Sequence, residues 1–127
     1  MEPSRCIIDS SVFVAFYCEI DSLHTDALRV MMELSDYILI VHPYVIQETT
    51  TVLAYGAGTG VAKKFLTDIT DASNVFIPSV DILHDMKLFA SSGSKLSFTD
   101  IALVGLAQET GVRLVTFDRQ MLSFYKR

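Results

Sequence analysis

SFTDIALVGLAQETGVRLVTFD, residues 97–118, is the stretch that decides the class of fold. After Ser97 the apolar residues recur at helical spacing, and Gly111 is typical of the residue that ends a helix. The apolar run that follows, residues 113–117, lacks polar alternation, which is typical of a strand buried on both faces. The stretch therefore predicts a helix that leads into a strand of a covered parallel sheet, with Asp118 at the end of that strand.

The same alternation of helices and strands extends through the rest of the chain. Further buried strands are predicted at residues 5–8, 37–41 and 74–77. Helices are predicted at residues 24–34, 43–55, 61–69, 81–90 and 97–110, with one or two helical turns at 119–125 and an ambiguous segment at 12–17. This alternation predicts a three-layer α/β/α sandwich with a parallel sheet of four or five strands.

The bulk properties predict a single domain that covers residues 1–127. The first residues lack the pattern of a secretory signal, and the longest aliphatic run, residues 38–41, is too short to cross a bilayer. We therefore expect a soluble cytoplasmic protein without membrane contacts. Cys6 and Cys18 form no CxxC pair, so both are predicted to be structural thiols.

The formal net charge of −5 argues against tight nonspecific binding of nucleic acid by the protein alone. It does not exclude a nucleic-acid substrate. If four carboxylates share one site, the remaining residues carry only −1, and a bound divalent metal ion would cancel much of the charge of the site.

Four acidic residues are predicted to meet at one edge of the sheet. Asp9 and Asp118 follow the first and the last predicted strands, at their carboxyl ends. Glu48 lies early in the helix that leaves the second strand, and Asp100 lies in the first turn of the helix that precedes the last strand. Because ligand sites in open α/β sheets lie beyond the carboxyl ends of the strands, we expect these four side chains to face one crevice.

Two of these acids interrupt apolar faces of their helices, where a solvated carboxylate is not expected. The apolar neighbours at helical spacing are Tyr44, Val45 and Val52 around Glu48, and Leu96, Leu103, Val104 and Ala107 around Asp100. Burial of a lone carboxylate costs several kcal/mol unless a partner or a cation compensates. Carboxylate oxygens are hard ligands that suit Mg²⁺ or Mn²⁺, so the pattern favours a site for one of these ions.

Each acid also has a purely structural interpretation. Asp100 fits a capping box with Ser97, Asp118 fits the N-cap of the last helix, and Asp9 fits a turn after a strand. These roles are compatible with metal binding. The remaining acids in polar surroundings or at element ends are expected to be solvated: Glu19, Asp21, Asp26, Glu33, Asp36, Asp68, Asp71, Asp85 and Glu109. The histidines, His24, His42 and His84, lack metal-ligand spacing and are expected to be structural or exposed.

Four segments together resemble the PIN-domain family, and in particular the VapC-like toxin ribonucleases of toxin–antitoxin pairs. They are Ile7-Ile-Asp9-Ser-Ser11, Val45-Ile-Gln-Glu48, Ser97-Phe-Thr-Asp100 with the residues up to Ala107, and Thr116-Phe-Asp118. The resemblance implies a parallel-sheet fold, Mg²⁺ or Mn²⁺ as cofactor, and cleavage of RNA as an endoribonuclease. It also implies, for many members, a homodimer and an inhibitory antitoxin protein as partner.

The resemblance assigns roles to individual residues. Asp9, Glu48, Asp100 and Asp118 match the acidic quartet of the family, and Ser11 and Thr116 match its supporting hydroxyl positions. We expect Asp9 and Asp100 to be the principal metal ligands. Asp118 is expected to hold a second ion or a metal-bound water, and Glu48 to ligate or to orient the attacking water. One departure is that few residues follow Asp118, which leaves little room for the fifth edge strand of many members.

Two other functions are alternatives to the nuclease. An aspartyl-phosphate phosphatase requires a second aspartate two residues after the nucleophile, whereas Ser10 and Ser11 follow Asp9. The second alternative is a PIN-like binding module that acts through a protein partner without catalysis, which the acidic net charge keeps open. Residues 12–17, VFVAFY, are expected to belong to the core; if exposed, they would suit such a partner together with Met31 and Met32.

Overall fold

The computed structural model describes residues 2–125 and contains, within them, a four-stranded parallel sheet and seven helices. The strands are β1 (Arg5–Ile8), β2 (Ile38–Ile40), β3 (Val75–Phe76) and β4 (Arg113–Val115). The helices are α1 (Ser10–Tyr17), α2 (His24–Glu33), α3 (Pro43–Gly56), α4 (Thr59–Asp71), α5 (Ile82–Ser91), α6 (Phe98–Thr110) and α7 (Arg119–Tyr125). The alternating order predicted from the sequence is confirmed.

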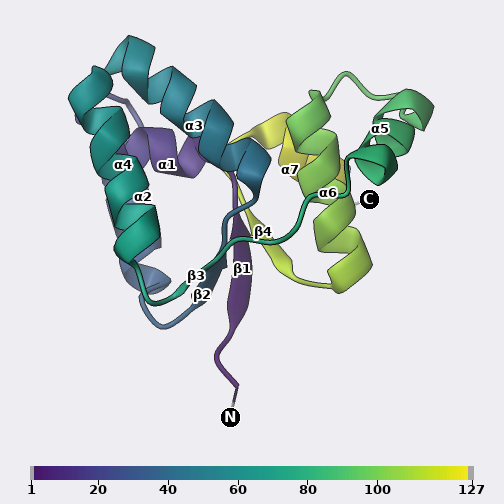
Figure 1. The fold of residues 1–127 in the computed structure, drawn as a ribbon, viewed down its shortest axis with the longest axis horizontal. Coiled ribbons are helices and arrows are strands. Elements are labelled where there is room, and N and C mark those ends of the chain that lie inside the picture. The colour runs from purple at the N-terminus through teal and green to yellow at the C-terminus, as the bar shows by residue number, and fades with distance from the viewer. Residues whose placement is uncertain (1, 126–127) are drawn as a thin grey trace.

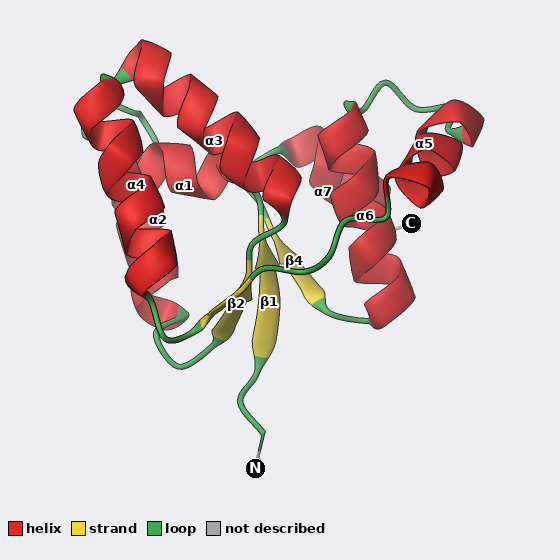
Figure 2. Cartoon of the chain, viewed as in Figure 1, coloured by secondary structure: helices red, strands yellow, loops and turns green. Residues whose placement is uncertain are grey.

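The helices lie on both sides of the sheet, so the predicted α/β/α architecture is confirmed. Figure 2 shows α1 to α4 on one side and α5 to α7 on the other. The central strand β1 is covered from both sides, and Cys6, Ile7 and Ile8 have no exposed surface. Strands buried on both faces need no polar alternation, which is why they were visible in the sequence as short apolar runs.

The order of the strands, β3-β2-β1-β4, places the first and last strands of the chain next to each other. Figure 1 shows the purple β1 beside the yellow-green β4. Ile8 pairs with Val115 in this register, and the backbone N–H of Asp9 donates to the carbonyl of Val115 at 3.0 Å. The chain leaves β1 toward β2 and returns on the opposite side as β4. This reversal is the switch point at which α/β sheets of this type bind ligands.

Residues 12–17, which the sequence left ambiguous, belong to α1 and to the core. Val12, Phe13 and Ala15 are buried, and the Phe13 ring packs against Phe65 of α4 with centroids 5.2 Å apart. The favoured expectation of ordinary core is therefore confirmed for this segment. Large apolar side chains are exposed elsewhere, notably in residues 76–89 of β3, α5 and the loop between them.

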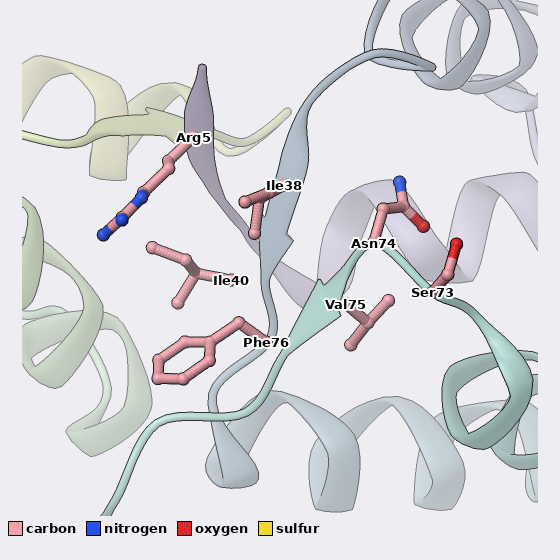
Figure 3. Close-up of a pocket in the computed structure, with 7 residues that line it drawn as sticks. All are labelled: Arg5, Ile38, Ile40, Ser73, Asn74, Val75 and Phe76. Atoms are coloured by element: carbon pink, nitrogen blue, oxygen red, sulfur yellow. The ribbon is translucent and has the colours of Figure 1, made fainter. Parts of the chain in front are cut away.

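An apolar groove of about 290 Å³ runs along the β3 edge of the sheet. Figure 3 shows Arg5, Ile40 and Phe76 pointing to the same side of the sheet within this groove. Phe76 is 56 % exposed, because no helix covers this part of the sheet edge. None of the four predicted site carboxylates lines the groove.

The ends of several elements follow the expected local chemistry. Gly111 ends α6 in the left-handed conformation, with φ of 71°, as its position in the sequence predicted. Pro43 occupies the first turn of α3. The residues after β4 form α7, and residues 2–125 contain no fifth strand. None of the helices that the structure describes is long and apolar enough to cross a membrane.

Both cysteines are free thiols, in line with the structural role expected of them. Cys6 lies in β1 without exposed surface, and burial raises the pKa of its thiol to about 11, although the charge of Arg113 acts in the opposite direction. A thiol with a raised pKa is a poor nucleophile at neutral pH.

Candidate functional site

Asp9 lies directly after β1, at the N-cap position of α1, and is only 3 % exposed. Its Oδ2 accepts two hydrogen bonds, from the Ser11 hydroxyl at 2.8 Å and from the Thr116 hydroxyl at 2.7 Å. The pairing of β1 with β4 brings Thr116 to this position from 107 residues away. The sheet topology thus places both hydroxyls on the carboxylate that they were expected to support.

The two hydroxyl groups are themselves oriented by the backbone. The N–H of Phe117 donates to Ser11 Oγ at 3.0 Å, and the N–H of Asp118 donates to Thr116 Oγ1 at 3.0 Å. Since each hydroxyl oxygen accepts a backbone proton, its own proton is directed at Asp9. The orientation of Asp9 is therefore fixed before any ligand binds.

The other carboxylate oxygen of Asp9, Oδ1, is buried and has no hydrogen-bond partner among the described residues. An unpaired buried oxygen of a carboxylate is costly, and such atoms in native proteins usually have a functional explanation. Oδ1 belongs to the same carboxyl group whose Oδ2 is held in place by two hydroxyls. This oxygen could therefore ligate a metal ion without breaking a hydrogen bond.

Asp100 lies in the first turn of α6, next to Asp9. Burial raises the pKa of its carboxyl, and the negative charges of Asp9 and, more weakly, Asp118 raise it further. The hydroxyl of Ser97 accepts from the backbone N–H of Asp100 at 3.1 Å and acts in the opposite direction on this pKa. Ser97 thus caps α6, as the structural interpretation of this motif predicted. A nearby cation would offset the negative charges that raise the pKa of Asp100.

The remaining two acids of the quartet lie on the same rim but accept hydrogen bonds from groups outside the quartet. Asp118 Oδ1 accepts from the backbone N–H of Met121 at 3.1 Å and caps α7, as its alternative interpretation predicted. Glu48 Oε1 accepts from the hydroxyl of Ser10, in the first turn of α1. Ser10 is buried, and no inference from the sequence had singled it out. Its one sequence signal is its position directly after Asp9.

The chemistry of these residues fits a divalent ion, although they do not form a complete coordination site. The four donors are carboxylates, and Asp9 offers a buried oxygen without a partner. Across residues 2–125, however, no three acidic, histidine or cysteine side chains are arranged to hold a metal ion together. Glu48 accepts from Ser10, and Asp118 accepts from a backbone N–H at the start of α7. Asp9 and Asp100 would be the principal ligands of such an ion.

A second group of polar side chains lies outside the quartet, between α3, α5 and α6. Asp85 was expected to be solvated, but this prediction was wrong, because it is buried and accepts from the Tyr44 hydroxyl at 2.7 Å. Burial raises the pKa of Tyr44 to about 12, and the hydrogen bond to Asp85 adds to the shift. His42 is buried beside Tyr44, and desolvation lowers its pKa. The exposed His84 and Glu109 pair nearby at 2.7 Å.

The fold defines an α/β domain with acidic residues at the switch point of a parallel sheet. The family model for the PIN domain matches residues 6–127, so the chain belongs to the PIN-domain family, and the resemblance seen in the sequence is confirmed. Among solved structures, the chain is similar to Mycobacterium tuberculosis VapC20, described as a toxin that cleaves the Sarcin-Ricin loop. The TM-score is 0.81, the sequence identity is 18 %, and 94 % of each chain is covered. No curated protein is a significant match to the sequence.

Proposed function

We propose that this protein is a Mg²⁺- or Mn²⁺-dependent endoribonuclease with Asp9, Glu48, Asp100 and Asp118 as its active site. The observation that carries the proposal is the environment of Asp9, with one oxygen fixed by Ser11 and Thr116 and the other buried without a partner. Membership of the PIN-domain family and the likeness of the fold to a ribonuclease toxin support it.

Each residue of the proposed active site has its own role. Asp9 and Asp100 bind the ion, and Ser11 and Thr116 hold Asp9 in the orientation needed for binding. Asp118 binds a second ion or a water on the first. Glu48 either ligates the ion or accepts a hydrogen bond from the water that attacks the phosphodiester. A divalent ion at this position would lower the pKa of a bound water and stabilise the charge that develops on phosphate.

The test is cleavage of a mixed RNA pool with and without Mn²⁺ by three proteins prepared identically: the natural chain, Asp9→Asn and Asp85→Asn. Asp85 is the matched control, because it is also buried but lies outside the quartet. We expect Mn²⁺-dependent cleavage by the natural chain and by Asp85→Asn, and none by Asp9→Asn. Full activity of Asp9→Asn would contradict the assignment. Absence of both cleavage and Mn²⁺ binding in the natural chain would favour the alternative, a PIN-like binding module without catalysis.

We further propose an antitoxin protein as inhibitor and a homodimer as the functional state. VapC20 is described as a toxin, which supports the first proposal. The second is supported by exposed apolar side chains of β3 and α5, among them Phe76 at 56 %, Leu83 at 66 % and Met86 at 51 %. Sedimentation of the natural chain and of Leu83→Lys tests the dimer. A natural chain that remains monomeric at high concentration would contradict it.

A further inference from the structure

A hollow of about 320 Å³ lies between the α5–α6 loop and α7. Loop residues 93–96 form one wall, and Gln120, Ser123 and Phe124 form the other. Both walls belong to segments that also carry acids of the quartet, because Leu96 precedes Asp100 by four residues and Gln120 follows Asp118 by two. The chain therefore links the hollow directly to two of the four acids.

The loop wall is fixed by its own hydrogen bonds. The hydroxyls of Ser92 and Ser94 lie 2.9 Å apart, the N–H of Ser94 donates to Ser92 Oγ at 3.2 Å, and the N–H of Leu96 donates to Ser94 Oγ at 3.3 Å. Leu96 is 5 % exposed and anchors the end of the loop in the core. The hollow is thus preformed, which lowers the entropic cost of binding a ligand there.

The walls combine the groups that recognise an unpaired nucleotide. Phe124 offers an aromatic ring that is only partly buried, and Gln120 and Ser123 are exposed hydrogen-bonding side chains of the same helix face. Lys95 contributes a cation that forms no ion pair with any described residue. Sites for single-stranded RNA pair aromatic rings that stack on bases with cations that contact phosphates.

The distribution of charge along the chain points to the same part of the molecule. Residues 1–94 contain five basic and twelve acidic residues, a net charge of −7. Residues 95–125, the rest of the chain that the structure describes, contain three basic and three acidic residues, a net charge of 0. Arg119, at the start of α7, is exposed and, like Lys95, forms no ion pair with any described residue. Lys95 and Arg119 are thus two cations available to the phosphates of a bound RNA in the less acidic part of the chain.

We infer that this hollow is a nucleotide subsite, which binds one unpaired nucleotide of the RNA next to the phosphodiester that is cleaved. The base stacks on Phe124 and is contacted by Gln120 and Ser123, and the phosphate of that nucleotide is contacted by Lys95. The inference rests on the proposed ribonuclease function and adds to it a binding site and the residues that form it.

The experiment measures binding without cleavage. A fluorescently labelled single-stranded RNA of mixed sequence is titrated into full-length Asp9→Asn protein, and into the same protein with Phe124→Leu or Lys95→Ala added. We expect Phe124→Leu to weaken binding at least tenfold and Phe124→Tyr, which keeps an aromatic ring, to restore it. Lys95→Ala should reduce the slope of log K against log salt concentration by about 0.7, the value for one phosphate contact with a single strand.

Two controls separate the subsite from general effects. Lys63→Ala and Tyr55→Leu remove an exposed cation and an exposed aromatic ring away from the hollow, and both should bind RNA as the Asp9→Asn parent does. Melting temperatures of all variants report whether Phe124→Leu merely unfolds α7. An RNA duplex should bind at least tenfold more weakly than the single strand.

The outcomes distinguish this inference from the function on which it rests. If the Asp9→Asn parent binds RNA and the folded Phe124→Leu and Lys95→Ala variants bind equally well, the subsite is wrong while the ribonuclease proposal stands. From such a result we would infer that the hollow binds a segment of a protein. If the parent shows no affinity for any RNA at low salt, the proposed function itself fails, and the subsite fails with it.

Discussion

Asp9 and Asp85 are both buried aspartates, yet their surroundings differ in one respect that decides their roles. Asp85 accepts from the Tyr44 hydroxyl and has no buried oxygen left without a partner. Asp9 receives two hydroxyl groups on one oxygen and none on the other. Burial of a carboxylate therefore does not by itself favour a metal ion in this molecule. The better candidate is a carboxylate that the fold holds firmly but leaves with one oxygen unpaired, since such a group gains from a cation.

The largest expected effect is a loss of stabilisation by metal in Asp9→Asn but not in Asp85→Asn. A ligand that binds only the folded state at 100 times its Kd adds about 2.7 kcal/mol to the free energy of unfolding. Saturating Mn²⁺ should therefore raise the melting temperature of the natural chain and of Asp85→Asn, and leave that of Asp9→Asn unchanged. Equal shifts in all three proteins, measured by calorimetry, would place the ion elsewhere and remove the contrast between the two aspartates.

A second variant sharpens the role of the hydroxyls that hold Asp9. Thr116→Val keeps the shape of the side chain but removes its hydrogen bond to Oδ2 and the acceptor for the N–H of Asp118. We expect Mn²⁺ to bind about 10- to 100-fold more weakly, as measured by isothermal titration calorimetry, because loss of a group that orients a ligand typically has an effect of this size. Thr70→Val, in an exposed turn of α4, is the control. Unchanged affinity in Thr116→Val would mean that Asp9 needs no hydroxyl support.

The third variant tests Asp85, the buried aspartate outside the quartet. Tyr44→Phe removes the donor to Asp85 and leaves that carboxylate buried without it. The free energy of unfolding, measured by urea denaturation, should fall by about 1 kcal/mol or somewhat more, because the unpaired acceptor retains its desolvation penalty. Mn²⁺ binding should not change. A change of Mn²⁺ affinity with no change of stability would show instead that Asp85 is part of the metal site.

The smallest expected effect concerns His84, which pairs with Glu109 at the surface. The hydrogen bond to Glu109 raises the pKa of His84 above its usual value. A group whose pKa is raised in the folded state stabilises the fold below the unfolded pKa, and this contribution disappears as the pH rises through the folded pKa. His84→Gln should therefore lose slightly more stability near pH 5.5 than near pH 8.5. Glu109→Gln should show the same pH dependence, and a difference from the natural chain that does not vary with pH would contradict it.

The alternating elements could be predicted because each is encoded locally. The buried strands are short apolar runs, and the helix starts and ends coincide with Pro43, Ser97 and Gly111. The position of the quartet on one rim also followed, since it requires only that the strands be parallel. The structure ends β4 at Val115, two residues before the predicted end, because Thr116 and Phe117 turn their polar groups to Asp9 and Ser11.

Contacts between distant elements could not be predicted from one sequence. The spacing of apolar residues shows which face of a helix is buried, but not which side chain of another helix lies opposite. Ser10 and Glu48 are 38 residues apart, and Tyr44 and Asp85 are 41 apart. The polar neighbours of Asp85 along the chain therefore predict a solvated side chain, although its partner in space is the hydroxyl of a tyrosine.

The pairing of β1 with β4 has a consequence for the order in which the protein is made. Asp9 is among the first residues to be synthesised, whereas Thr116, which orients it, follows 107 residues later. At the usual speed of translation this interval is about 5–20 s. During that time the nascent chain contains a carboxylate without the hydroxyl group and the neighbouring strand that position it. The proposed active site is therefore complete only after translation has passed Asp118.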